Sequence, residues 1–430
     1  MEAGARSEPQ ERIAVAYEVY ARTPRSVGPK ISAAAQAAGV PRSRIYEFWS
    51  SAAHLGEDLA VFRATPETSW QAQVMAASDT DVFDAIRSAV QSPTAAAGVT
   101  ARAVLSAEPI GSRPRARLQA AEDRWLRWLA ERLRSTADQE APVPWTVAAA
   151  TITALVEGAL LIHGPARTGT TAPLDAAFAD VVAATAAGAT AHFASQVTGA
   201  DVALETDGVE HRPAPEAAQL LDRIVGALDE ATGSSPLTDD RRRVSPKVLA
   251  AELGVSPRWI FGLWPATVDF NADLFEESLR RLSSVTDLAA MTAFSDATIT
   301  DPSQVSSVLV RINEHLMDVN ATSEPLIFLS LLDLLGQAEV AGRSAETIQA
   351  WAAGNQVRAA AILGATNRKL IPGVSLVDYA DLGSAIGVGG WRLCATHREL
   401  IAHRCTYLGE DVAAIAAGLD AITKACTRPM

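Results

Sequence analysis

The chain has 430 residues, 48% of them apolar, so it is too long for one hydrophobic core and long enough for two to four domains. Its net charge of −13 excludes a protein that coats nucleic acid or an anionic membrane along its whole surface, because such partners require a broad positive field. Lys and Arg nevertheless exceed Asp and Glu by three in residues 11–50 and by four in residues 241–260, so two local basic faces are expected.

Three short helices are predicted at the start of the chain. Apolar side chains recur at helical spacing over residues 11–21. Residues 31–38 predict a second helix, and Gly39 supplies the positive φ that a sharp turn between helices requires. Pro41 stands at the first position of a third helix, which runs from Arg42 to Trp49. Three short helices with a tight turn between the last two predict a helix-turn-helix.

Longer helical segments follow, separated by Pro and Gly breaks. Helices are predicted over residues 55–62, 81–90, 101–106, 114–134, 145–163 and 174–197. The segment 145–163 is the most apolar, but it contains Glu157 and many small residues, which favours a buried helix over a membrane span. No segment alternates apolar and polar residues over a strand's length, so an all-α fold without any β-sheet is expected.

The features of residues 31–49 return in the second half of the chain. Residues 244–264 repeat the Ala-rich helix, the Gly-Val turn, the second short helix and the closing Trp. Gly254 follows Gly39 by half the chain length (254 − 39 = 215). Because internal repetition decides architecture, two units of about 215 residues are expected. The first helix of the second unit is predicted around residues 221–228, followed by helices at 248–253 and 257–264.

The repeat predicts the domain boundaries. Residues 199–215 are acidic, lack a periodic apolar face and end in a Pro-rich stretch, which is typical of a linker. The predicted domains are 1–54, a first helix-turn-helix; 55–198, a first helical domain; 199–215, the linker; 216–270, a second helix-turn-helix; and 271–430, a second helical domain. Residues 180–188 and 411–418 share small residues near the end of each unit, and helices there are candidates for the contact between the units.

The cysteines and histidines favour neither a disulfide framework nor a metal site. Cys394, Cys405 and Cys426 are odd in number, which is typical of a reducing compartment. The chain opens without a basic leader and apolar core, so a cytoplasmic location without a membrane partner is expected. His397 and His403 stand at irregular spacing from the cysteines for zinc. With no phosphate loop or nucleophile elbow, neither an enzyme nor a cofactor is expected.

Both helix-turn-helix stretches carry one set of residues. The first has Gly39, Val40, Ile45, Tyr46, Trp49, Ser51 and Leu55, and the second has Gly254, Val255, Ile260, Phe261, Trp264 and Phe270. This pattern resembles the TetR family of transcriptional regulators. The chain departs from the family pattern at Ala52 and Thr267, where a phosphate-contacting Lys is usual, and at Phe261, which lacks the hydroxyl of Tyr46. These changes weaken the anchoring of DNA phosphates.

The resemblance implies two tandem TetR-like units, each with an N-terminal three-helix helix-turn-helix domain and a C-terminal helical bundle that pairs through its last two helices. One chain holding both units is expected to form an intramolecular pseudo-dimer that binds a double-stranded DNA operator as a ligand-responsive repressor. The candidate DNA-binding residues are Lys30, Arg42, Ser43, Arg44, Tyr46, Arg243, Lys247, Arg258 and Trp259. Because the third helices of the units differ, an operator with two unlike half-sites is expected. Trp259 fits either a reading position or inward packing.

The family's larger domain holds a mostly apolar ligand cavity, so a small apolar ligand is expected as a second partner. The candidate lining residues are Trp125, Trp128, Trp145, His163, Trp351, Trp391 and His397. Each also fits an ordinary core position, since Trp125 and Trp128 at i, i+3 form the stripe of any buried helix. The alternative is a non-DNA-binding interaction or small-molecule-sequestering protein with degenerate helix-turn-helix heads. The absent lysines and the net charge favour this alternative; the paired basic windows favour DNA binding.

Overall fold

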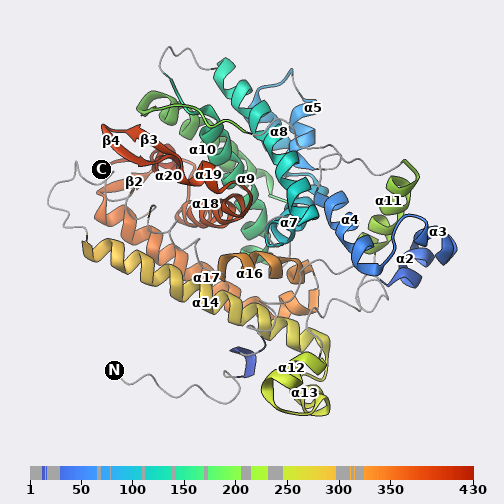
Figure 1. Ribbon diagram of the computed structural model, residues 1–430. Helices are drawn as coiled ribbons and strands as arrows, with labels where there is room; N and C mark the ends of the chain where they lie inside the picture. The colour runs from blue at the N-terminus through green and yellow to red at the C-terminus, as the bar shows by residue number, and fades with distance from the viewer. Residues whose placement is uncertain are drawn as a thin grey trace, which may run out of the picture.

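Helices account for most of the protein in the computed structural model, as the sequence predicts (Figure 1). The structure describes residues 12–14, 16, 30–64, 69–77, 79–108, 112–136, 142–168, 173–204, 215–230, 246–296, 310, 314, 324–336 and 338–430. Arg243, most of the predicted first helix and residues 205–214 of the predicted linker lie outside these ranges.

The first half of the chain folds into successive helices close to the predicted segments. They are α2 (Ile31–Ala37), α3 (Arg42–Tyr46), α4 (Ala52–Ala64), α5 (Trp70–Ala76), α6 (Val82–Val90), α7 (Pro93–Ser106), α8 (Arg113–Thr136), α9 (Trp145–Thr168) and α10 (Ala176–Gln196). Helix α5 was not predicted. It begins after Ser69, whose side chain accepts a hydrogen bond from the N–H of Ala72, a capping contact that satisfies one of the helix's unpaired donors.

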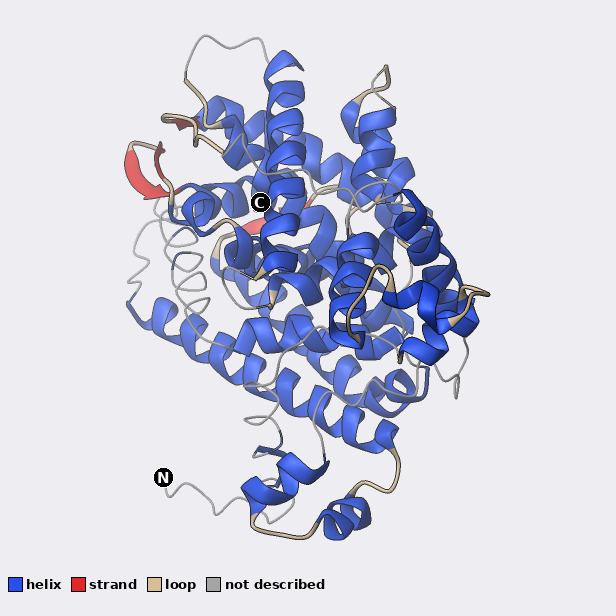
Figure 2. Ribbon diagram, turned by 45° about the vertical axis from the view of Figure 1, so that its right-hand side comes forward, coloured by secondary structure: helices blue, strands red, loops and turns tan. Residues whose placement is uncertain are grey.

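The second half is also helical. Its helices are α11 (Pro215–Glu230), α12 (Pro246–Leu253), α13 (Pro257–Leu263), α14 (Thr267–Asp296), α16 (Glu324–Leu331), the 3₁₀ helix η4 (Leu332–Gly336), α17 (Ala338–Ala365), α18 (Leu376–Thr396), α19 (Arg398–Ala402) and α20 (Ala414–Cys426). Figure 2 shows how few strands accompany them. Helices α14 and α17 lie along one side of the body, next to α16 and α18 (Figure 1).

Two small β-sheets contradict the expectation that the chain contains none. The strands are β1 (Val197–Thr198), β2 (Arg368–Leu370), β3 (Arg404–Tyr407), β4 (Glu410–Ala413) and β5 (Thr427–Pro429). Antiparallel pairing gives one sheet in the order β1-β3-β4 and a second of β2 and β5. Strand β3 buries Cys405 and Tyr407 on one face, and the turn to β4 uses positive φ at Leu408 (53°) and Gly409 (86°). Such a two-residue turn matches the twist of a hairpin.

Helix α9 of the first half and helix α18 of the second half pack against each other at the centre of the molecule. Helix α9 crosses α18 so closely that a Cβ added to Gly158 would lie 1.7 Å from the Ala385 carbonyl oxygen. A Cβ added to Gly389 would lie 1.9 Å from the Ala154 carbonyl oxygen. The two contacts are reciprocal, because one interval relates both pairs of residues (389 − 158 = 385 − 154 = 231). Reciprocal contact of this kind is the geometry of a two-fold interface.

Helices α10 and α20 form a second contact between the halves. Gly188 of α10 faces Ala425 of α20, and an added Cβ would lie 3.0 Å from the Ala425 Cβ. The contact expected between these small-residue helices is therefore present. Asp411 and Val412, however, lie in strand β4, so the stretches 180–188 and 411–418 do not match along their whole length.

We expect Gly389→Ala to destabilise the protein by about 1–3 kcal/mol, because the new methyl group overlaps the backbone of α9 and must push the helices apart. Gly387→Ala, on the same helix, meets no atom within 4 Å and is the matched control. It is expected to be neutral or slightly stabilising, since Ala is the better helix former. Denaturant unfolding of both variants measures the difference. Equal free energies of unfolding would contradict the close approach.

Among the residues that the structure describes, two segments are long and apolar enough to cross a membrane, Trp145–His163 and Ala176–Gln196. The most apolar window of the first segment is entirely buried inside the protein, and half of the corresponding window of the second is buried. Trp145–His163 therefore forms the buried core helix that the sequence predicts. Its small residues allow the close packing of α18 on α9.

Candidate nucleic-acid interface

Two small heads carry the predicted helix-turn-helix stretches at the edges of the helical body (Figure 1). The first head comprises α2, α3 and the start of α4, and the second comprises α12, α13 and the start of α14. Their turns have the same geometry: Gly39 has φ 66° and Gly254 has φ 67°. In each, the Val after the glycine donates its N–H to the carbonyl of a preceding Ala at 2.9 Å. The glycines are required because a side chain is strained at this φ.

The interior of each head repeats as well. Trp49 Nε1 donates to Asp58 Oδ2 at 3.0 Å, and Trp264 Nε1 donates to Asp273 Oδ2 at 2.7 Å. Both tryptophans are buried. The hydrogen bond ties the end of the third helix to the helix that follows, so the indole fixes the angle between them. The interval of 215 residues therefore relates specific contacts, beyond the residue types that suggested it.

The first head presents the predicted reading residues to solvent. Lys30, Arg42 and Ser43 are exposed, and Tyr46 is 55% exposed. Arg44 is half-buried: its guanidinium pairs with Glu47 and with Glu216 and lies over the Phe48 ring at 5.2 Å. These carboxylates raise the pKa of Arg44, with Glu47 as the larger cause, so it remains a cation.

The second head has a different surface. Lys247 and Arg258 are exposed. Trp259 is 36% exposed and Phe261 is 50% exposed, so Trp259 does not pack inward. The guanidinium carbon of Arg12 lies 4.3 Å from the centre of a Trp259 ring. Aromatic side chains thus stand where the first head has Arg44 and Tyr46, and one of them is covered by a cation.

The sequence predicts helix α11 as the first helix of the second head. In the structure, α11 packs against the first head instead. Its apolar face joins the cluster formed by α2, α3 and α4. The buried residues that it contributes are Ala217, Leu220, Leu221 and Ile224. Arg223 Nη1 donates to the carbonyl of Ala38, the C-cap of α2, at 3.2 Å. Leu221 and Ile224 of the predicted apolar face are buried, but periodicity does not say which head such a face covers.

The residues proposed to line a ligand cavity pack in the interior. Trp125 donates to Thr153 Oγ1 at 2.9 Å and stacks on Trp128 at a ring distance of 5.5 Å. His163 stacks on Phe178 at 4.2 Å, and its Nε2 lies 3.0 Å from Asp175 Oδ2. The remaining candidates are buried or half-buried: Trp145, Trp351, Trp391 and His397. Trp125 and Trp128 lie together, whereas His163 belongs to the contact of α9 with α10.

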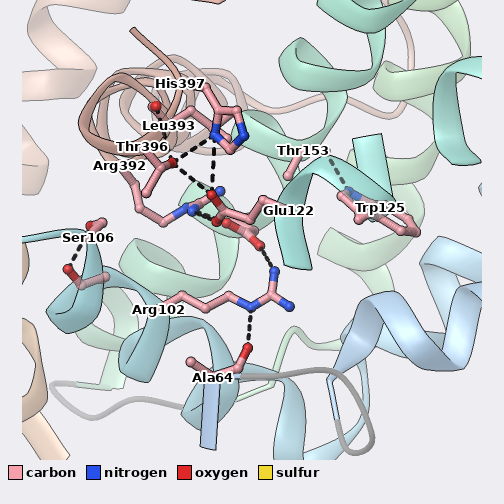
Figure 3. Close-up of polar contacts among 12 residues, drawn as sticks. Ala64, Arg102, Ser106, Glu122, Trp125, Thr153, Arg392, Leu393, Thr396 and His397 are labelled. Atoms are coloured by element: carbon pink, nitrogen blue, oxygen red, sulfur yellow. Dashed lines mark hydrogen bonds and ion pairs between the residues drawn. The ribbon is translucent and has the colours of Figure 1, made fainter. Parts of the chain in front are cut away.

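A buried ionic network, which the sequence did not predict, joins the two halves of the chain (Figure 3). Its members lie on α7, α8, α9 and α18 or directly after α18, and all are buried. The members are Arg102, Glu122, Asp123, Glu157, Arg392, Thr396 and His397. Of these residues, the sequence proposes only His397 for a site, as a residue lining the ligand cavity. The signal available in the sequence was Glu157, a carboxylate within the most apolar segment.

Arg392 is the centre of this network. Its guanidinium pairs with Glu122 and with Glu157, both from the first half of the chain. Arg102 Nη1 lies 2.9 Å from the other oxygen of Glu157, and its Nε donates to the Ala64 carbonyl at 2.9 Å. The second half thus supplies one arginine to two carboxylates of the first half. A buried charge requires such partners, because desolvation is costly.

His397 contacts two carboxyl groups of the first half. Its Nε2 lies 3.0 Å from Asp123 Oδ1, and its Nδ1 lies 3.3 Å from Glu122 Oε2. Burial lowers the pKa of His397, but the hydrogen bonds with Asp123 and Glu122 outweigh it and raise the pKa to about 9. Burial opposes the charge on Glu122, yet Arg392 and His397 hold the pKa of that carboxyl below its usual value. At neutral pH the Glu122 carboxylate therefore faces two cations, Arg392 and His397.

The chain matches no family model and no curated protein.

Proposed function

We propose that the protein is a TetR-like DNA-binding transcriptional regulator whose single chain forms a pseudo-dimer. The observation that carries this proposal is the repeated head. Two turns with nearly equal φ at Gly39 and Gly254, each followed by a short helix with exposed cationic side chains, have the form of a helix-turn-helix. In such a motif the second helix of the pair enters the major groove. Here these helices are α3 and α13.

The interface between the halves supports the pseudo-dimer. Dimeric helix-turn-helix proteins present two heads to one duplex, so the heads must be held by a symmetric contact. The reciprocal approach of α9 and α18 at Gly158 and Gly389, together with α10 on α20, supplies such a contact within one chain. The buried network fixes this interface further, because Arg392 reaches two carboxylates across it.

The two heads are equipped for different bases. Arg44 on α3 is suited to the paired acceptors of guanine. Helix α13 offers Arg258, with the apolar surfaces of Trp259 and Phe261 beside it. We therefore expect the operator to contain two unlike half-sites. Selection of binding sites from random DNA measures this, and recovery of a perfect palindrome would contradict it.

A direct test of the function is fluorescence anisotropy with the DNA upstream of the protein's own gene, at two salt concentrations, against unrelated DNA of equal length. Specific binding should exceed non-specific binding by about 10³-fold or more and weaken as salt rises. Equal binding to both DNAs would oppose the proposal. A ligand-responsive repressor also requires a ligand with different affinities for the DNA-bound and DNA-free states. The ligand response is thus a separate part of the proposal.

The second candidate function is a non-DNA-binding interaction or small-molecule-sequestering protein. The exposed aromatic surface of the second head favours it, as do Ala52 and Thr267 at positions where a phosphate-binding lysine is usual. Absence of any salt-dependent DNA binding by the intact chain would support this candidate.

Substitutions on the first head separate base reading from phosphate contact. Arg44→Ala is expected to reduce discrimination at one base position by about 1–3 kcal/mol. Arg42→Ala and Lys30→Ala are expected to weaken binding to all sequences and to lower its salt dependence. Titration of each variant with matched and singly mismatched operators measures both effects. Equal losses for all three variants on every sequence would count against these roles.

A further inference from the structure

The first head is completed by a helix that follows the first unit in the chain. Helix α11 buries Leu221 and Ile224 against α2 and α4, and Arg223 caps the carbonyl of Ala38. These contacts hold the start of α11 next to α3. Glu216, at the second position of α11, thereby reaches the guanidinium of Arg44.

The second head has an equivalent neighbour from the start of the chain. Arg12 lies over Trp259 on α13 at 4.3 Å, and Ala16 is fully buried. Figure 1 shows this segment beside α12 and α13. Arg12 precedes the first head in sequence, yet it contacts the second. The segments that precede the two heads in the chain are therefore exchanged between them.

In both heads the exchanged segment touches the same position. Trp259 follows Arg44 by the interval that relates the two turns (259 − 44 = 254 − 39 = 215). Glu216 contacts Arg44, and Arg12 contacts Trp259. We propose that each exchanged segment positions the reading residue of the head that it completes, so that Glu216 sets the base preference of Arg44 and Arg12 sets the orientation of Trp259. This inference rests on the proposed DNA-binding function.

The physical effect of Glu216 on Arg44 has two parts. A free arginine side chain loses much rotational freedom when it binds a base, and a carboxylate that already holds the guanidinium reduces this loss. Glu47 holds one side of the guanidinium and Glu216 the other, above the Phe48 ring. The same carboxylates repel DNA phosphates, so they cost affinity for every sequence. Glu216 is thus expected to increase discrimination at the expense of non-specific affinity.

Glu216→Gln in the full chain tests the inference. We expect discrimination between the matched first half-site and a single mismatch at the Arg44 position to fall about tenfold, within the range of one arginine–base contact, while binding to unrelated DNA becomes tighter. Glu57→Gln removes the same charge from α4 of the same head and is the matched control, expected to keep the wild-type discrimination. Anisotropy titrations at two salt concentrations measure both quantities. An unchanged thermal unfolding midpoint verifies that the exposed substitution leaves the fold intact.

The same anisotropy titrations are applied to Arg12→Ala. This variant should alter the base preference in the second half-site and leave the base preference in the first half-site unchanged. If wild-type protein binds its operator, and Glu216→Gln and Arg12→Ala discriminate between matched and mismatched sites as wild type does, the positioning inference is wrong while the proposed function stands. If wild-type protein binds no DNA specifically, the proposed function fails and this inference fails with it. A loss of discrimination in Glu57→Gln equal to that in Glu216→Gln would also overturn the inference, because charge alone would then explain the effect.

Discussion

Replacement of Arg392 by Met is expected to destabilise the protein by about 3–5 kcal/mol, the usual cost of removing one partner from a buried ion pair. Arg392 is fully buried and pairs with Glu122 and Glu157. Without it, both carboxylates remain in the interior with reduced compensation. Met keeps the apolar length of the side chain, so that the loss reports on charge more than on a cavity. Denaturant unfolding at pH 7 measures the change.

Arg404 provides the matched control. It also pairs with two carboxylates, Glu314 and Asp411, but its side chain is half exposed. Exposed pairs contribute about 0–1 kcal/mol, because water screens the charges and solvates the partner that is left. Arg404→Met should therefore lower the free energy of unfolding by no more than that. Similar losses for Arg404→Met and Arg392→Met would contradict the central role of the buried network.

The heads could be predicted from the sequence because local chemistry determines them. Gly adopts a φ near 66° with the least strain, and each buried tryptophan follows its turn glycine by the same number of residues. Their hydrogen-bond partners, Asp58 and Asp273, are also separated by 215 residues. The repetition of this Trp and Asp spacing is visible in the sequence. The helical body was predicted for a similar reason, since long apolar periodicities persist whatever they pack against.

The hairpin could have been found. Cys405 and Tyr407 alternate with polar residues, and Leu408 with Gly409 supplies the turn. The alternation spans only four residues, so it is a weaker signal than the Ala-rich helix that follows the hairpin. The packing of α11 on the first head could not be predicted from a local pattern of this kind. The apolar face of α11 fits a head, but its choice between two similar heads depends on contacts such as Arg223 with Ala38, 185 residues away.

The ionic network was equally out of reach. Arg392 and Glu122 are 270 residues apart, and nothing in the local pattern of either helix indicates that they meet. A single charged residue in an apolar segment, such as Glu157, predicts only that some buried partner exists. Sequence patterns therefore identify the elements of this protein, whereas the contacts that join its halves depend on tertiary structure.

His397 should make stability fall as pH rises above neutrality. Its pKa is raised in the folded protein to about 9, above the ordinary value of 6.5. The native state then binds more protons than the unfolded state between these pH values, so the stabilisation is complete below pH 6.5 and is lost as pH rises through about 9. At 1.36 kcal/mol per unit, the loss is about 3 kcal/mol. The groups that face the ring are Glu122 and Asp123 from α8 and Thr396 from α18.

Unfolding of wild type and His397→Gln at pH 6.5 and pH 9.5 isolates this contribution. Burial also raises the pKa of the Cys405 and Cys426 thiols to about 11, so both proteins lose some further stability at alkaline pH as unfolded thiols ionise. That loss is common to the two proteins and cancels in the difference between them. The free energy of unfolding should therefore fall by about 3 kcal/mol more in wild type than in the variant. Parallel pH dependences would mean that His397 does not carry a proton across the interface between the halves.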